Sequence, residues 1–168
     1  DAETCSLLLT DPESGDLVFT VAQGPVAHLL PKGRVLRRGE GIAGWVQVNE
    51  KPVLVPDAYA DPRFNREVDR QTGYRTNTIM SVPLAVKNRP IGVASLMNKN
   101  GGGPFSEEDL ELFTIIGAQA SIAIDNARLH TAMLAKQRME FELEIAASIQ
   151  RDFLPHTPPC VPGFELAG

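Results

Sequence analysis

The fold is decided by residues 78–97, TIMSVPLAVKNRPIGVASLM. Two apolar runs in this stretch, residues 78–86 and 91–97, are rich in side chains that favour β-strands. Between them stand Asn88, Arg89 and Pro90, which favour a turn. The stretch therefore predicts a β-hairpin.

A second pair of strand-forming runs lies nearer the N-terminus. Residues 5–10 and 17–23 are apolar, and residues 11–16 between them have the composition of a turn, so they predict another hairpin. Residues 24–41 contain several glycines and prolines without a sustained period, which predicts a loop around a short basic segment. The basic residues of that loop are Arg34, Arg37 and Arg38.

A short helix and a short strand are predicted between the two hairpins. Apolar residues recur at helical spacing in residues 42–49, and Pro52 ends this helix before the apolar strand at residues 53–55. Residues 64–74 leave two interpretations open, a poorly amphipathic helix or an irregular segment.

A single long helix is predicted for residues 107–154, which contain no proline and only one glycine. Ser106 is a favourable N-cap, acidic residues follow in the first turn, and Phe105 and Leu110 are spaced for a hydrophobic staple. Pro155 ends the helix. Two hairpins with helices between and after them, and no repeated strand–helix unit, indicate an α+β fold with a mostly antiparallel sheet and helices on its faces.

The predicted helix is longer than one domain needs. A helix of about 48 residues is about 70 Å long, roughly twice the diameter of a small domain. Part of it is therefore expected to extend beyond the domain. The first part is apolar over a wide arc, so we expect it to cover the sheet and also to face a second surface, which suggests a homodimer.

Beyond Asn126 the apolar residues follow an interrupted heptad repeat. In a coiled coil these residues would form the seam, the stripe along which two helices pack. Lys136 and Gln150 fall on or beside the seam, and the register shifts between Met133 and Met139. Two interpretations stay open: a coiled-coil linker that switches by changing register, or a solvated connector whose spacing has no function. The seam positions are Leu129, Met133, Met139, Leu143, Ala146, Ile149 and Phe153.

The composition excludes several classes of protein. The chain has 168 residues, 43% of them hydrophobic, and a net charge of −5 without a dense basic cluster. Neither nucleic acid nor a membrane is therefore expected as a partner, and no apolar run is long enough to span a bilayer. Cys5 and Cys160 are too few for a disulfide framework, so a cytoplasmic location is expected. Because the chain begins at Asp1, we expect it to be a piece of a longer protein.

Five segments together resemble the GAF domain family. They occur in the family's order at residues 39 and 41–46, 55–57 and 61–64, 79–84, 91–99, and 105–109 with 123–129. The resemblance implies a sensory domain, residues 1–129, that holds a small ligand between the sheet and the short helices. The residues implied as lining this site are Trp45, Phe64, Tyr74, Thr78, Met80, Ser95 and Met97. For each of them the alternative is an ordinary place in the core.

Family members that bind cyclic nucleotides carry a motif of Asn and Lys, then Phe, then Asp and Glu. Asn98, Lys99, Phe105 and Asp109 match this motif, whereas Leu110 stands at the Glu position. We favour a structural role for the four residues. Lys99 at a strand end and Asp109 in the first helical turn are able to pair and to fasten the helix to the sheet.

Residues 142–168 are similar to the lead-in of the metal-dependent serine phosphatases that control bacterial sporulation and stress sigma factors. The matching residues are Ala147, Ile149, Gln150, Leu154, Pro155, Pro158, Gly163 and Leu166. This similarity implies a helical linker at residues 130–155, a truncated start of a phosphatase domain at residues 156–168, and a bacterial parent phosphatase that the GAF domain regulates.

The chain itself is expected to be neither an enzyme nor a metal-binding protein, because the Gly-Gly-Asp segment that precedes the metal ligands of those phosphatases is absent. The identity of the ligand and of any cofactor stays open. The alternative function is a ligand-free structural dimerisation module of the same phosphatase.

Overall fold

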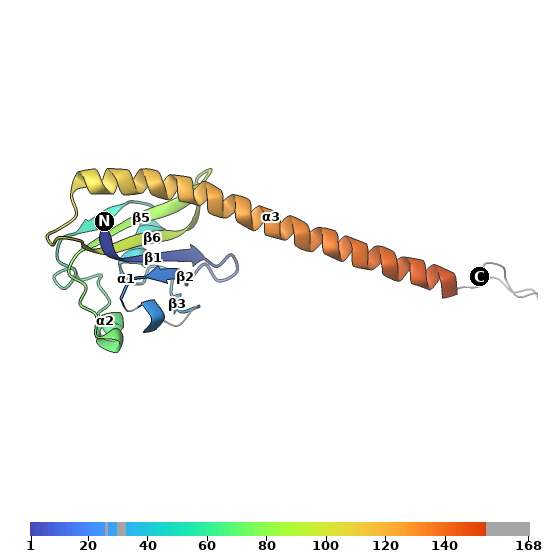
Figure 1. Cartoon of the computed structure of the whole chain (residues 1–168), viewed down its shortest axis with the longest axis horizontal. Coiled ribbons are helices and arrows are strands. Elements are labelled where there is room, and N and C mark those ends of the chain that lie inside the picture. The colour runs from blue at the N-terminus through green and yellow to red at the C-terminus, as the bar shows by residue number, and fades with distance from the viewer. Residues whose placement is uncertain (26, 30–32, 154–168) are drawn as a thin grey trace, which may run out of the picture. The chain divides into compact units, whose positions relative to one another are not determined.

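The computed structural model describes residues 1–25, 27–29 and 33–153, with side chains up to residue 149 (Figure 1). The chain divides into two compact units, Asp1–Asp125 and Asn126–Gly168. The first unit contains the whole sheet and the beginning of the long helix α3 (Glu107–Phe153), and the second unit contains the remainder of that helix.

One six-stranded sheet organises the first unit, in the order β3-β2-β1-β6-β5-β4 (Figure 1). Every neighbouring pair is antiparallel. The predicted α+β fold with an antiparallel sheet is thus confirmed. The strands are β1 (Ala2–Thr10), β2 (Leu17–Gln23), β3 (Val35–Leu36), β4 (Val53–Val55), β5 (Ile79–Val86) and β6 (Arg89–Lys99).

The turn of the β5–β6 hairpin lies one residue earlier than predicted. Lys87 and Asn88 form it, with φ of 50° and 63°, and Val86 pairs with Arg89. A two-residue turn of this hand needs positive φ at both central positions, and the ring of Pro90 holds φ negative. Pro90 therefore belongs to β6 and not to the turn.

The segment predicted as a loop at residues 24–41 contains regular structure. A 3₁₀ turn, η1, spans Ala27–Leu29, and β3 pairs with β2 through Leu17↔Leu36 and Val18↔Val35. The prediction of a loop throughout was wrong because a strand of two residues is too short to produce a hydrophobic period.

Two short helices follow the predicted positions. Helix α1 (Gly41–Asn49) ends at Glu50, whose left-handed backbone, with φ of 53°, donates its N–H to Val46 O. Helix α2 (Glu67–Thr72) decides between the two interpretations of residues 64–74 in favour of a helix, which stops at Gly73 with φ of 71°. Both ends use the left-handed conformation that commonly terminates helices.

The start of α3 agrees with the prediction in detail. The backbone N–H of Asp109 donates to Ser106 Oγ at 3.2 Å, and the N–H of Ser106 donates to Asp109 Oδ2 at 2.8 Å. This reciprocal pair is a capping box with Asp at the third position. Phe105 is buried, and Leu110 packs against the same cluster. The helix is continuous to Phe153, and the predicted stop at Pro155 lies outside the described residues.

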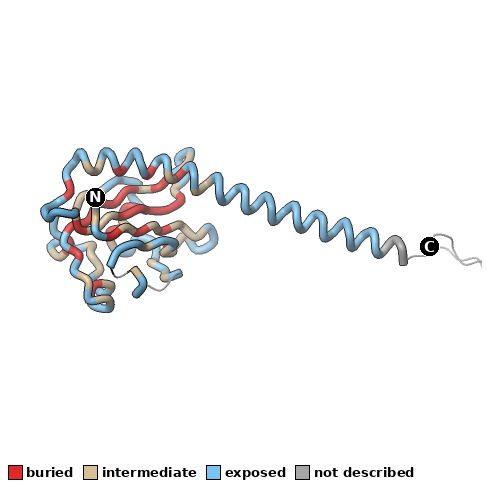
Figure 2. The backbone as a smooth tube through the Cα atoms, viewed as in Figure 1, coloured by how far each residue is buried: buried red, intermediate tan, exposed pale blue. Residues whose placement is uncertain are grey.

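One face of the sheet is covered by α3. Val82 and Leu84 of β5 form a buried cluster with Phe105 and Phe113. Figure 2 shows buried backbone along the central strands beneath the long helix. The helix approaches the sheet closely at Gly117, where an added Cβ would lie 3.0 Å from Val82 Cγ2. Glycine at this position therefore allows close packing.

The opposite face of the sheet is covered by α1 and α2. Val46 of α1 is fully buried against Leu8 and Val93, and Ile42 packs with Val55 and Ile79. Helix α2 lies over the neighbouring part of this face, and its residues line the candidate site.

Candidate functional site

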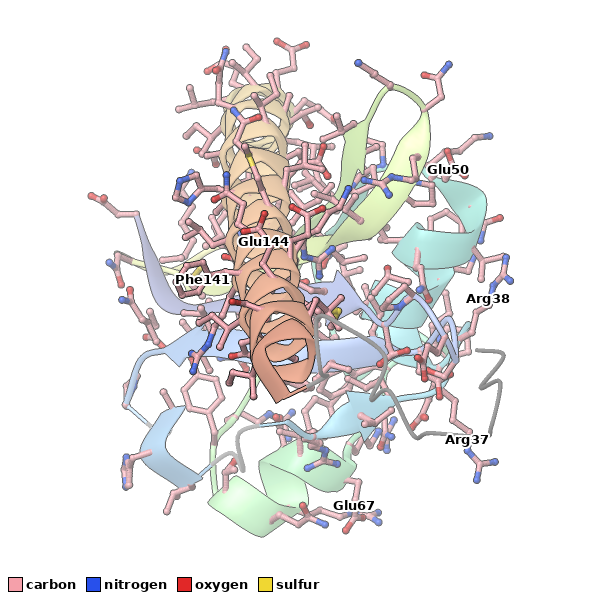
Figure 3. All side chains as sticks on the ribbon, turned by 90° about the vertical axis from the view of Figure 1, so that its right-hand side faces the viewer. Arg37, Arg38, Glu50, Glu67, Phe141 and Glu144 are labelled. Carbon is pink, nitrogen blue, oxygen red and sulfur yellow. The ribbon has the colours of Figure 1, made fainter. Side chains whose placement is uncertain are left out.

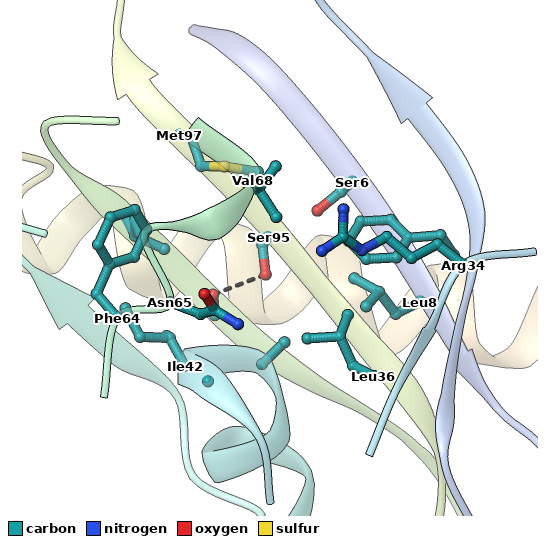
Figure 4. Close-up of a pocket in the computed structure, with 15 residues that line it drawn as sticks. Ser6, Leu8, Arg34, Leu36, Ile42, Phe64, Asn65, Val68, Ser95 and Met97 are labelled. Atoms are coloured by element: carbon teal, nitrogen blue, oxygen red, sulfur yellow. Dashed lines mark hydrogen bonds between the residues drawn. The ribbon is translucent and has the colours of Figure 1, made fainter. Parts of the chain in front are cut away.

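Two adjoining cavities lie between the sheet and its α1–α2 cover. Their volumes are about 110 Å³ and about 120 Å³. They share six lining residues, contributed by β1, β2, β6, α2 and the segment that leads into α2. The shared residues are Ser6, Phe19, Phe64, Asn65, Val68 and Met97. Figure 4 shows the first cavity with these elements around it.

Side-chain alternation along β5 decides which residues reach the cavity. Ile79 and Ser81 line it, whereas Met80 and Val82 belong to the cluster under α3. Successive residues of a strand point to opposite faces, so Met80 lies on the far side of the sheet. The prediction that Met80 lines the ligand site is corrected by this placement.

Four of the seven predicted lining residues are brought together. Phe64 and Met97 line both cavities, Ser95 lines the first, and Tyr74 lines the second. That they contact a ligand remains a prediction. Trp45 and Thr78 border neither cavity.

Trp45 and Thr78 have other surroundings. Trp45 packs against the Val46 cluster, and the guanidinium carbon of Arg63 lies 4.6 Å from the centre of its ring. Arg63 is itself held by Asp61, with Nη2 and Oδ2 2.6 Å apart, and this contact lowers the pKa of the Asp61 carboxyl. Thr78 is buried at the start of β5, and its Oγ1 has no hydrogen-bond partner among the described residues.

A row of three serines crosses the floor of the first cavity. Ser6 pairs with Ser95 across β1 and β6, and Ser95 pairs with Ser81 across β6 and β5. Their exposed fractions are 3%, 5% and 0%, and Ser81 Oγ lies 2.7 Å from Ser95 Oγ (Figure 4). The sequence predicted only Ser95. The alignment of the three serines depends on the pairing of β1, β6 and β5, so the sequence of one strand does not predict it.

Arg34 is the charged residue of the first cavity. Its backbone is fixed beside β2, because Phe19 N–H donates to Arg34 O at 2.9 Å. Its half-buried side chain lines the cavity, and its Nη1 donates to Gln71 Oε1 of α2 at 3.1 Å. The sequence marked Arg34 as part of a basic segment but gave no signal that it reaches a cavity.

Helix α2 is fastened to the sheet by a buried carboxylate. Asp69 accepts hydrogen bonds from the N–H and the hydroxyl of Thr76, both at 2.7 Å, and from the Tyr59 hydroxyl at 3.1 Å. Asp69 also lines the second cavity. Its oxygens are therefore already used for holding α2 in place.

The first residue of the cyclic-nucleotide motif, Asn98, is the centre of a buried hydrogen-bond network. Its Oδ1 accepts from the N–H of Asn77 at 2.7 Å, and its Nδ2 donates to Arg75 O at 2.8 Å, to Tyr74 Oη at 3.0 Å and to Glu3 Oε2 at 3.1 Å. The backbone of Asn98 is left-handed, with φ of 54°. This geometry supports the structural role predicted for Asn98.

The predicted pairing of Lys99 with Asp109 is confirmed. Lys99 Nζ lies 2.5 Å from Asp109 Oδ2 and ties the end of β6 to the first turn of α3. The hydrogen bond from Lys99, followed by that from the Ser106 N–H, lowers the pKa of Asp109 to about 2. The contact lies at the helix end, away from the cavity lining.

Residues 1–25, 27–29 and 33–153 contain no group of three or more His, Cys, Asp or Glu that could hold a metal ion. Cys5 is a free thiol whose pKa is raised by burial, and Cys160 lies outside the described residues.

No helical stretch in the described part combines the length and hydrophobicity of a membrane span.

An antiparallel sheet with a long helix on one face and a small cavity under short helices on the other defines a class of α+β regulatory domains. The chain belongs to the GAF domain family, which matches residues 1–124. The match ends next to the boundary of the first compact unit, Asp1–Asp125.

Two animal phosphodiesterases are similar in sequence. Over 88% of its length the chain is 31% identical to a probable 3′,5′-cyclic phosphodiesterase of Caenorhabditis elegans. Over 66% of its length it is 40% identical to the dual 3′,5′-cyclic-AMP and -GMP phosphodiesterase 11 of Drosophila melanogaster. The chain spans only 21% and 8% of these two proteins.

Solved structures share the fold at lower identity. The GAF domain of a phosphoenolpyruvate-protein phosphotransferase from Coxiella burnetii superimposes with a TM-score of 0.69 at 23% identity, over 78% of this chain and 76% of that one. Free methionine-R-sulfoxide reductase from Neisseria meningitidis gives a TM-score of 0.63 at 22% identity, over 77% and 71% of the two chains. These likenesses concern the fold alone.

Proposed function

We propose that this GAF domain binds a small ligand in the cavities beneath α1 and α2 and relays its presence through α3 to an effector domain. The observation that carries the proposal is the first cavity itself. It is lined mainly by apolar side chains, yet Arg34, Ser6 and the Ser81–Ser95 pair bring polar groups to it. An apolar pocket with a few convergent polar groups is the usual form of a small-molecule site.

The size of the cavities favours a ligand smaller than a nucleotide. Even together, the volumes of about 110 Å³ and about 120 Å³ fall below the lower end, about 300 Å³, of pockets for drug-sized ligands. The relatives act on 3′,5′-cyclic nucleotides, but Leu110 stands where the cyclic-nucleotide motif has Glu. We therefore do not assign a cyclic nucleotide to this chain.

Strands β5 and β6 support the proposed relay because one face of each strand borders the cavity and the other borders α3. Ser81 and Ser95 face the cavity, while their neighbours Val82 and Ala94 pack in the cluster under α3. A ligand that shifts these strands would change the surface on which α3 packs. Ligands act on such a two-state element through their different affinities for its states.

The outer face of α3 supports a homodimer as part of the proposal. Leu112, Ile115, Ile116 and Ile122 are exposed although the helix buries Phe113 on its other side. In the second unit, Met139, Phe141 and Leu143 are also exposed, and Figure 3 labels Phe141 on this part of the helix. Figure 2 shows the tube of this part of α3 coloured as exposed. A second copy of α3 would cover both surfaces. The same exposed apolar residues of α3 also support the alternative function, a structural dimerisation module that binds no ligand.

For the effector we propose a bacterial metal-dependent serine phosphatase that regulates sigma factors, located in the cytoplasm. The support is the similarity of residues 142–168 to the lead-in of such enzymes, although residues 154–168 lie outside the described part. The phosphodiesterase relatives offer the other candidate effector, a cyclic-nucleotide phosphodiesterase domain. The residues that follow this sequence in the parent decide between them, because a Gly-Gly-Asp segment is expected for the phosphatase.

A thermal-shift screen against nucleotides and small metabolites tests ligand binding. A ligand at about 100 times its Kd should stabilise the chain by about 2.7 kcal/mol. Val68→Phe, which fills the space beneath α2, should abolish that shift, whereas Val48→Phe on the exposed side of α1 should retain it. Absence of any shift in the wild-type chain would favour the structural dimerisation module.

A further inference from the structure

We propose that the ligand is a small organic carboxylate with an apolar body, and that its carboxylate pairs with Arg34. This inference rests on the proposed ligand-binding function. It concerns the charge of the ligand, which the size of the cavity alone does not define.

Arg34 has a half-buried side chain that forms no ion pair with any described residue. The one side-chain hydrogen bond of Arg34 within the described residues goes to the neutral side-chain oxygen of Gln71. By contrast, Arg63 is paired with Asp61, and Arg89 with Asp125. A partly desolvated guanidinium gains most from a planar anion that accepts two parallel hydrogen bonds.

The two acidic side chains of α2 have other partners. Glu67 accepts from Gln71 Nε2 at 2.8 Å and lies 4.0 Å from Arg70 Nη1. Asp69, which lines the neighbouring cavity, already accepts hydrogen bonds from Tyr59 and Thr76. Neither carboxylate pairs with Arg34, so the charge at the cavity stays positive.

A second observation points to the same ligand group. Ser6 is only 3% exposed and lines both cavities, so its hydroxyl is accessible from within them. Figure 4 shows the Arg34 side chain extending across the cavity toward Ser6. A hydroxyl that lines a cavity is able to donate a hydrogen bond to an acceptor on the ligand. One oxygen of a carboxylate held by Arg34 is such an acceptor.

The remaining lining defines the body of the ligand. Leu8, Leu36, Ile42, Phe64 and Met97 surround the first cavity and offer only apolar contact or sulfur. The cavity volume of about 110 Å³ is too small for a nucleotide base with its sugar phosphate. A branched aliphatic or aromatic acid fits both the size and the lining.

Calorimetric titration of the full chain tests the proposal with matched probes. The acids are 4-methylpentanoate and phenylacetate, and their neutral counterparts are 4-methylpentanamide and phenylacetamide. At least one acid should bind the wild-type chain, and its amide should bind at least about tenfold more weakly, as expected for the loss of a charge-assisted hydrogen bond. Equal binding of acid and amide would overturn the proposal.

Arg34→Gln should weaken binding of the same acid about tenfold or more, and Arg34→Lys should restore part of it. The control is Arg37→Gln, which removes the same charge three residues away, from a side chain that extends outward (Figure 3). Equal effects of the two Gln variants would contradict pairing at Arg34. If neither acid binds while another metabolite of the thermal-shift screen does, the carboxylate proposal fails and the proposed function stands. If nothing binds at all, both fail.

Discussion

At the scale of single residues, the end of β6 shows how a familiar motif serves the fold. Asn98 and Lys99 are adjacent in sequence but have different partners. Asn98 holds the segment before β5, and Lys99 holds the first turn of α3 through Asp109. The two contacts together fasten the end of β6 to the segment before β5 and to α3, which explains these residue types without a ligand.

The contact between Lys99 and Asp109 predicts a pH-dependent contribution to stability. The folded pKa of Asp109 is about 2, below its ordinary value of 3.8, so the ionised carboxylate stabilises the fold above about pH 4. This stabilisation is lost as the pH falls from about 4 toward about 2. Asp109→Asn should lower the melting temperature at pH 7, and its difference from the wild type should shrink toward pH 2.

Melting temperatures followed by circular dichroism between pH 7 and pH 2 measure this difference. Glu111→Gln is the control, because it removes a negative charge from the same helix at an exposed position. A difference between wild type and Asp109→Asn that stays constant across this range would contradict the assignment.

At the scale of elements, α1 owes its position to a close approach between two glycines. A Cβ added at Gly44 would lie 2.5 Å from the carbonyl carbon of Gly39 and 2.9 Å from its Cα. Both atoms belong to the backbone, so no side chain can move aside. The N-terminal end of α1 forms part of the cavity wall through Gly41, Ile42 and Ala43.

Gly44→Ala should therefore destabilise the chain although alanine favours helices. We expect a net loss of about 1–2 kcal/mol, because a clash with backbone atoms belongs at the upper end of the roughly 1–3 kcal/mol that overpacking costs and outweighs the gain of about 1 kcal/mol in helix propensity. Urea unfolding measures it. Val48→Ala in the same helix, where the side chain is 48% exposed, should change stability by less than about 0.5 kcal/mol. Similar losses in the two variants would argue against the glycine contact.

At the scale of the whole molecule, the two units expose apolar surface on the same helix. In the second unit, Leu143 and Ile149 are 65% and 50% exposed. They belong to the predicted seam, whose last position, Phe153, has no described side chain. Whether the register change between Met133 and Met139 acts as a switch stays a prediction.

Leu143→Asp and Ile149→Asp should weaken self-association, since each places a charge on the proposed seam. Light scattering over a range of concentrations measures the mass, which should fall from dimer toward monomer. Ser148→Asp introduces the same side chain at an exposed position on the side of the helix opposite Met139 and Ala146, and it should leave the mass unchanged. A wild-type chain that is monomeric throughout, or Asp variants that keep the dimer mass, would contradict the helical dimer.

Local patterns in the sequence determined the elements of this domain. Alternation and turn residues predicted both hairpins, helical spacing predicted α1, and Ser106 with Asp109 marked the first turn of α3. These features depend on neighbours a few residues apart, so their physical causes are present in any short window of the chain.

Only the tertiary structure decided the composition of the candidate site. Pairing of β1 with β6 aligns Ser6 with Ser95, and pairing of β2 with β3 brings Arg34 beside Phe19. Strand order and register determine these contacts, and they join residues far apart in the chain. The incorrect prediction for Met80 has the same cause. A methionine suits either face of the sheet, and the pairing of β5 with β6 placed Met80 on the face under α3.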